Sequence, residues 1–195
     1  MKYEEIEGDL ISLALSGQFD VIAHGCNCQC VMGAGLAPQM AKAFKCDYFD
    51  LEHSFQKGNI NKLGQIDYNC YKLRNNEAVV CAKDFRVAQL SVVNAYTQYM
   101  YGTNHTDGVS KPLDYEALTL CLKKINHIFK GKHIGLPAIG TGLAGGVWDW
   151  TDTKTHMWSA IDLFKYQSGA KKDVKTIIKE ELKDMNITVV HYKPN

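Results

Sequence analysis

Residues 21–44 contain the change of pattern that most limits what this chain can fold into. The stretch opens with an apolar run at 21–23, crosses small and polar residues and the glycines Gly33 and Gly35, and then repeats apolar residues at helical spacing through 36–44. This pattern predicts a buried strand, a loop and a helix. A glycine loop that leads into a helix offers free backbone N–H groups, which suit an anion such as a phosphate. An ordinary strand-to-helix turn would show the same pattern.

A second glycine-rich loop occupies residues 137–146 and follows a short predicted strand at 133–136. In an open α/β sheet the ends of neighbouring strands line one crevice, and ligands bind there. The two loops could therefore close on the same ligand.

The remaining chain alternates predicted strands with predicted helices, without an internal repeat or a linker. Further strands are expected at 2–6, 64–73, 78–82, 89–96 and 187–191, and further helices at 48–56, 113–130, 153–166 and 174–185. Asp9 precedes a short apolar run at 10–15 and is a candidate helix N-cap. Such alternation favours a mixed, largely parallel α/β sandwich, and the 195 residues are expected to form a single domain.

The composition excludes several classes of protein. A net charge of +1 gives no reason to expect general binding to nucleic acid or to a membrane. The apolar runs are short and the N-terminal residues are acidic, so a cytoplasmic protein is expected, and a monomer. Seven cysteines without an export signal are expected to be free thiols, and their spacing shows no pattern of a zinc site. No metal or cofactor is expected.

Four motifs together resemble the macro domain family, whose members bind ADP-ribose. They are GDL at 8–10, HGCNCQCVMGAGLA at 24–37, VVNAYTQYMYG at 92–102 and LPAIGTGLAGGVW at 136–148. Within the family they look most like the branch that contains ADP-ribose 1''-phosphate phosphatases and terminal ADP-ribose-protein glycohydrolases. The resemblance covers about residues 1–148 and 171–193, and it implies a three-layer α/β/α macro domain with a mixed central sheet. Residues 149–170 look partly like an insertion.

The resemblance also implies a role for individual positions in binding ADP-ribose. Asp9 would accept a hydrogen bond from the adenine amino group, Asn27 would lie against the distal ribose, and Tyr192 would pack near the adenine. The first loop would border the distal ribose and the diphosphate, and backbone N–H groups of the second loop would hold the diphosphate. The ligand-binding residues expected besides these three are Leu10, Gly33, Ala34, Gly35, Gln98, Ile139, Gly140, Thr141, Gly142 and Leu143.

The chemistry expected at the distal ribose is hydrolysis of ADP-ribose 1''-phosphate to ADP-ribose and phosphate. His24 is the residue near the first loop, apart from cysteines, that titrates near neutral pH in its unperturbed state, and it matches a histidine of the yeast-type phosphatases. As a general acid or base it would act with Asn27 and with Asp149, the first carboxylate beyond the second loop. A strand-end histidine bonded to backbone is the alternative role for His24.

Departures from the family pattern leave other functions open. The glycohydrolase branch uses a lysine in the segment that here reads NAYTQ, and an aspartate where this chain has Ala144. Other de-ADP-ribosylating macro domains have an aspartate where the nearest equivalent here is Ala37. These losses favour phosphatase chemistry or simple binding. A non-catalytic ADP-ribose-binding module is the first alternative, and an ADP-ribosyl hydrolase acting on modified macromolecules is the second.

Overall fold

The structure is a computed structural model that describes residues 2–48, 57–81, 87–102, 111–151 and 172–192. Seven strands in these ranges form one sheet in the order β1-β7-β6-β2-β5-β3-β4. Their bounds are β1 Tyr3–Gly8, β2 Val21–Asn27, β3 Ile66–Arg74, β4 Glu77–Cys81, β5 Leu90–Gln98, β6 His133–Pro137 and β7 Asn186–Tyr192.

The sheet is mixed, as expected. The strand pairs from β1 through β7, β6 and β2 to β5 are parallel, while β5/β3 and β3/β4 are antiparallel. Asn75 and Asn76 form the two-residue turn between β3 and β4, with φ angles of 49° and 61°. Asparagine tolerates positive φ better than most residues, which suits it to this tight hairpin.

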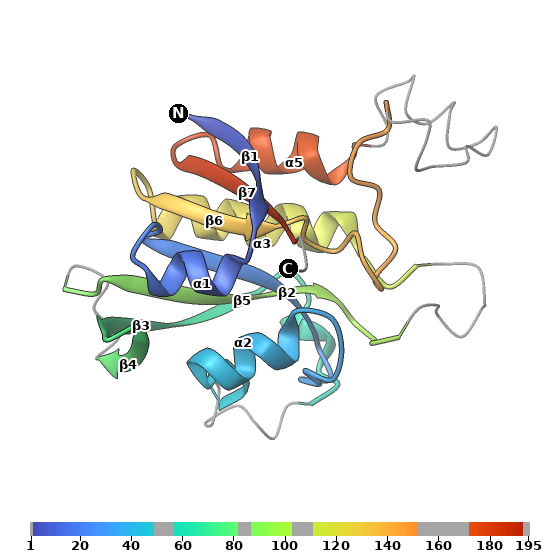
Figure 1. Cartoon of the computed structure of the whole chain (residues 1–195). Helices are drawn as coiled ribbons and strands as arrows, with labels where there is room; N and C mark the ends of the chain where they lie inside the picture. Colours follow the sequence, from blue (N-terminus) through green and yellow to red (C-terminus); the bar gives the residue numbers. More distant parts are fainter. Residues whose placement is uncertain (1, 49–56, 82–86, 103–110, 152–171, 193–195) are drawn as a thin grey trace.

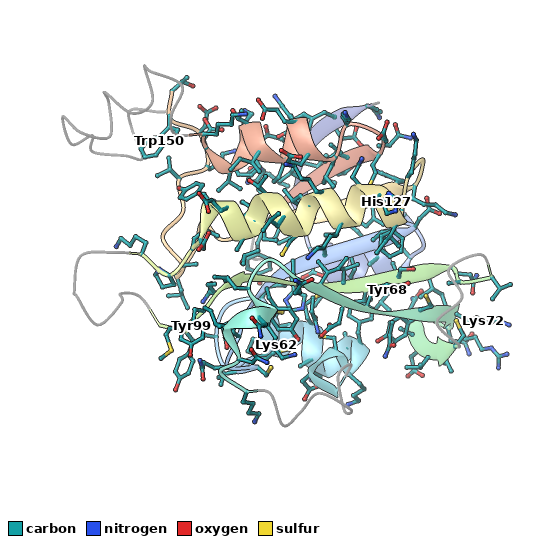
Figure 2. The ribbon with its side chains drawn as sticks, turned by 180° about the vertical axis from the view of Figure 1, so that it is seen from behind. Lys62, Tyr68, Lys72, Tyr99, His127 and Trp150 are labelled. Carbon is teal, nitrogen blue, oxygen red and sulfur yellow. The ribbon has the colours of Figure 1, made fainter. Side chains whose placement is uncertain are left out.

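Helices cover both faces of the sheet and complete the three-layer α/β/α architecture predicted from the sequence (Figure 1). The helices α1 (Leu10–Leu15) and α2 (Ala37–Phe44) lie on one face, and α3 (Tyr115–Ile128) and α5 (Val174–Glu181) lie on the other. Figure 2 shows α3 and α5 in front of the sheet, with Trp150 beside the first turn of α5. Two short 3-10 helices, η1 (Cys46–Tyr48) and η3 (Ile60–Lys62), follow α2 and precede β3.

Aspartates start three of the four α-helices found in the described residues. Asp9 caps α1 through a 2.6 Å bond from the Ser12 N–H, as the sequence predicts, and Asp114 and Asp173 cap α3 and α5 in the same way. Each carboxylate satisfies an N–H that has no partner within its helix.

The central strand β2 is buried along most of its length, and its side chains alternate between the two faces. Val21 and Ala23 pack in the core beneath α3 and α5, whereas Ile22 packs with α1 and α2. His24 therefore follows Ile22 onto the α1/α2 face. The strand runs on to Asn27, so the polar cluster after residue 23 belongs to the strand and not to the loop.

Some expected elements cannot be compared with the structure. The predicted helix at 48–56 lies outside the described residues except for Tyr48, and so do the predicted helix at 153–166 and most of the predicted insertion. Among the residues that are described, no helix is both long and apolar enough to span a bilayer.

Candidate functional site

The two glycine-rich loops meet at one edge of the sheet. The loops follow β2 and β6, which are parallel neighbours paired at Val21↔Ile134 and Ile22↔Gly135. Their carboxyl ends therefore lie side by side, where ligands bind in open α/β sheets. A pocket of about 530 Å³ lies between the loops, lined by residues 24–27, 31–37, 98, 101–102, 137–140 and 142–144.

The first loop is shaped by a bulge at the end of β2. The pairing with β5 shifts between Cys26 and Asn27, which brings Asn27 opposite Gln98, and both residues line the pocket. The Asn27 amide holds the loop in place, because its Oδ1 accepts from the Val31 N–H at 3.1 Å and its Nδ2 donates to the Val31 carbonyl at 2.7 Å. Gly35 takes a φ of 65° just before α2 begins.

The second loop begins with a tight turn. The Ala138 carbonyl accepts from both the N–H of Thr141, at 3.2 Å, and its hydroxyl, at 2.7 Å. Gly140 has a φ of 73°, a conformation that side chains rarely adopt, and a Cβ there would stand 2.6 Å from Leu113 Cδ1. A Cβ on Gly146 would stand 2.2 Å from Leu113 Cδ2. Leu113 thus fills the space that these two glycines leave and supports the loop from beneath.

Both loops present unused backbone donors around the pocket. The N–H groups of Gly33, Ala34, Gly35, Gly142 and Leu143 donate to no other group in the described part of the chain. The described lining contains no Asp, Glu, Lys or Arg side chain. An anion in this pocket would therefore be held by backbone N–H groups, and such hydrogen bonds are strengthened by the charge of the acceptor.

His24 belongs to the pocket lining but sits in a closed network. Its Nε2 lies 2.8 Å from Asn94 Oδ1, 3.7 Å from Cys26 Sγ and 3.8 Å from Cys46 Sγ. Burial lowers the pKa of His24 to about 4, although the bond to Asn94 opposes that shift. The expectation that His24 titrates near neutral pH is therefore wrong, because the surroundings favour the neutral imidazole.

Asp149 lies away from the pocket. Its Oδ1 accepts from the N–H and the hydroxyl of Thr151, and its Oδ2 lies 3.3 Å from Lys175 Nζ. The Thr151 hydroxyl bond is the main reason why the pKa of Asp149 is lowered, and the Lys175 ammonium adds to it. Lys175 also lies 3.0 Å from Glu5, so Asp149 joins the exit of the second loop to β1 and α5. The structure does not bring Asp149 together with His24.

The residues expected near the adenine also lie outside the pocket lining. Asp9 caps α1, and Leu10 is buried in the core between α1 and the sheet. Tyr192 is 66% exposed at the end of β7, opposite Gly8 in register. Asp9 and Tyr192 therefore lie at the ends of the neighbouring strands β1 and β7, which are three and two strands along the sheet from β2. Thr141, also outside the lining, uses its hydroxyl within the turn.

The remaining predicted site residues do line the pocket. They are His24, Asn27, Gly33, Ala34, Gly35, Gln98, Ile139, Gly140, Gly142 and Leu143. Their roles in ligand binding or catalysis remain predictions.

Sequence reasoning missed four residues that shape the site. Tyr101 and Cys26 line the pocket, Leu113 supports the second loop and Asn94 binds His24. The alternation of β5 could have pointed to Asn94, since Asn94 lies opposite His24 in register. Leu113 carries no sequence signal of this role.

The cysteines are thiols outside any disulfide bond, as expected. Burial raises the pKa of Cys26 well above its usual value and that of Cys46 to about 12. In the described ranges, no three His, Cys, Asp or Glu side chains form a group that could hold a metal ion.

No family model matches the chain. A 17.5 kDa protein from the tk-vs intergenic region of Enterobacteria phage T4 is 33% identical over 148 residues, which make up 74% of this chain and 81% of that protein.

Several solved structures share the fold at lower identity. A protein of unknown function from Bacteroides thetaiotaomicron superposes with a TM-score of 0.61 at 24% identity over 98% of both chains. The macrodomain of Thermus aquaticus DarG gives 0.55 at 18% identity, again over 98% of both chains. Thermosipho africanus DarTG in complex with ADP-ribose gives 0.58 at 17% identity, over all of this chain and 42% of that one. The chain therefore belongs to one family with the phage T4 protein, and its fold is that of a macro domain.

Proposed function

We propose that the chain binds ADP-ribose in the pocket between the two glycine loops. One observation carries this proposal: unused N–H groups from both loops surround a pocket whose described lining has no charged side chain. A diphosphate offers several anionic oxygens close together, which several N–H donors can bind at once. Thermosipho africanus DarTG, which has the same fold, was solved in complex with ADP-ribose and adds support.

The positions of the other residues suggest how the ligand would lie. Asp9 and Tyr192 at the ends of β1 and β7 are available to the adenine, on the far side of the second loop from β2. Asn27, Gln98 and His24 are then available to the distal ribose. The diphosphate would cross the two loops between these ends.

Hydrolysis of ADP-ribose 1''-phosphate is the reaction that the sequence resemblance suggests for this pocket. The geometry supports binding more strongly than this reaction. Burial lowers the pKa of His24 to about 4, which disfavours a protonated general acid near neutral pH, and Asp149 lies with Lys175 outside the lining.

Two measurements test the proposal. Isothermal titration calorimetry with ADP-ribose, and with AMP and ribose 5-phosphate as partial ligands, should show binding of the intact diphosphate ligand well above either part. Absence of heat with ADP-ribose would refute the proposed function. Incubation with ADP-ribose 1''-phosphate and with an ADP-ribosylated protein, read as released phosphate and free ADP-ribose, then separates a phosphatase, a macromolecular hydrolase and a non-catalytic module. His24→Ala should lower phosphate release if His24 takes part in that reaction.

A further inference from the structure

The polar side chains of the described pocket lining divide into buried groups and groups that a ligand can reach. The side chains with a nitrogen, an oxygen or a thiol are His24, Cys26, Asn27, Gln98 and Tyr101. The first three are buried, and the Asn27 amide already bonds Val31 through both its oxygen and its nitrogen. Gln98 is half-buried and Tyr101 is exposed. Among these five, Gln98 and Tyr101 are therefore the side chains available for polar contact with a ligand.

One hydrogen bond fixes the orientation of the Gln98 amide. Gln98 Nε2 donates to the Met100 carbonyl at 2.8 Å, and because a carbonyl only accepts, the amide cannot be turned round. Gln98 Oε1 accepts no hydrogen bond within the described chain, and it is not one of the buried atoms that lack a partner there. The amide therefore offers an open oxygen, which accepts a hydrogen bond from a donor such as a hydroxyl.

The same bond anchors the segment that carries Tyr101, shortly after the end of β5 at Gln98. Tyr101 is 54% exposed although it lines the pocket, and its hydroxyl has no partner within the described chain. A tyrosine ring presents a flat apolar face and a polar tip. A sugar matches these two residues, because it has hydroxyl donors around its edge and C–H groups on its faces.

Gln98 and Tyr101 share their pocket with the unused N–H groups of both loops. Gln98 lies opposite Asn27 at the base of the first loop, and its carbonyl accepts from the Cys28 N–H at 3.0 Å. In ADP-ribose a ribose is joined to each end of the diphosphate. A ligand whose diphosphate lies on the loops therefore has a sugar next to its phosphates in either direction of binding.

We infer that Gln98 and Tyr101 form a sugar subsite of this pocket, in which Gln98 Oε1 accepts a hydrogen bond from a ribose hydroxyl and the Tyr101 ring packs against the sugar. The inference rests on the proposed function. It assigns to the pocket a class of ligand in which a diphosphate is joined to a neutral group that carries hydroxyls. The loops bind the charge, and Gln98 and Tyr101 recognise the neutral group beside it.

Three substitutions test this subsite. Gln98→Met keeps the length of the side chain and removes the acceptor. Tyr101→Ala removes the ring, whereas Tyr101→Phe keeps it and removes the hydroxyl. The matched control is Gln18→Met, the same chemical change at an exposed glutamine between α1 and β2, outside the lining. Calorimetry with ADP-ribose measures the affinity of the wild type and of each variant.

The losses expected are those of single contacts. Gln98→Met should weaken ADP-ribose binding about three- to tenfold, the effect of one neutral hydrogen bond. Tyr101→Ala should weaken it about tenfold, and Tyr101→Phe should weaken it less than Tyr101→Ala. Gln18→Met should stay within about twofold of the wild type. Unchanged affinity in Gln98→Met or in Tyr101→Ala would overturn the inference.

A further readout separates recognition of the sugar from support of the loops. In ligand-free Gln98→Met, the amide resonances of the five loop donors, Gly33, Ala34, Gly35, Gly142 and Leu143, should match those of the wild type. A loss of affinity accompanied by displaced resonances of these amides would overturn the inference, because Gln98 would then act through the shape of the loops.

A second measurement needs no variant and covers the case in which a variant does not fold. A hydrogen bond to Gln98 Oε1 polarises the whole amide, so the side-chain N–H resonances of Gln98 in the wild type should shift as ADP-ribose saturates the protein. Unmoved Gln98 side-chain resonances at saturation would overturn the inference. Failure of the wild type to bind ADP-ribose at all would instead refute the proposed function, so the two failures are distinguishable.

Discussion

Replacing Leu113 should show whether its side chain holds the second loop in its binding shape, in addition to stabilising the fold. Its side chain is 6% exposed and occupies the space beneath Gly140 and Gly146. Leu113→Ala removes buried methyl groups at a cost of about 2–5 kcal/mol, which corresponds to a fall in Tm of roughly 5–15 °C for a chain of this size. The turn at Gly140 would also lose the wall that fixes it.

The effect on ligand binding should exceed that of any equally destabilising change elsewhere. Binding would have to order a loosened loop, which costs on the order of a tenfold loss of affinity. The control is Leu182→Ala at the C-cap of α5, a fully buried leucine outside the pocket lining, which should lower Tm by a similar amount and leave affinity unchanged. Differential scanning fluorimetry and calorimetry with ADP-ribose measure the two quantities. Equal affinities of Leu113→Ala and Leu182→Ala would show that Leu113 does not hold the loop in its binding shape.

Three further predictions concern single positions. A Cβ on Gly142 meets nothing within 4 Å, so Gly142→Ala should leave Tm unchanged but lower the affinity for ADP-ribose. Gly17 has a φ of 82°, so Gly17→Ala should lower Tm by a few degrees and leave the affinity unchanged. The reverse pattern would place the ligand elsewhere. The pKa of His24 falls from 6.5 to about 4 on folding, so in this pH range the unfolded state binds a proton that the folded state does not. The free energy of unfolding should therefore drop by on the order of 3 kcal/mol as the pH falls from 6.5 to 4. His24→Asn should remove this part of the pH dependence in urea titrations, and an unchanged pH profile would contradict the lowered pKa of His24. Asp149→Asn should lower the free energy of unfolding by at most about 1 kcal/mol, a Tm shift of roughly 2–4 °C, because the Asp149–Lys175 pair is partly exposed. The same change should alter the affinity for ADP-ribose less than twofold. Loss of ligand turnover with full stability would restore a catalytic role to Asp149.

The fold was accessible from the sequence where local pattern and burial agree. The glycines after β2 and β6 mark the two loops, and the aspartate before Leu10 marks the start of α1, because turns and caps depend on a few neighbouring residues. The end of β2 was not accessible in this way. His24 and Asn27 are polar residues buried at the end of the strand, where His24 lies against Asn94 and Cys46 and Asn27 pairs with Gln98. No local pattern in the sequence records these contacts.

The site was less accessible than the fold because it depends on the order of the strands. Asp149 follows the second loop in sequence, but its partners come from α5 and, through Lys175, from β1, at the side of the sheet away from β2. The neutral state of His24 likewise follows from burial among residues distant in sequence, such as Asn94 and Cys46, which lie 70 and 22 residues away, although the bond to Asn94 itself opposes the shift. Residue type alone suggested a titrating histidine, whereas the packing determines its pKa.

The central claim is that backbone donors of the two loops hold the diphosphate of ADP-ribose. Titration of the ¹⁵N-labelled protein with ADP-ribose, followed through the amide resonances, tests this most directly. The largest downfield shifts should fall on Gly33, Ala34, Gly35, Gly142 and Leu143, the amides that have no acceptor in the described chain. Saturable binding that leaves these five amides unmoved and shifts others would contradict the claim.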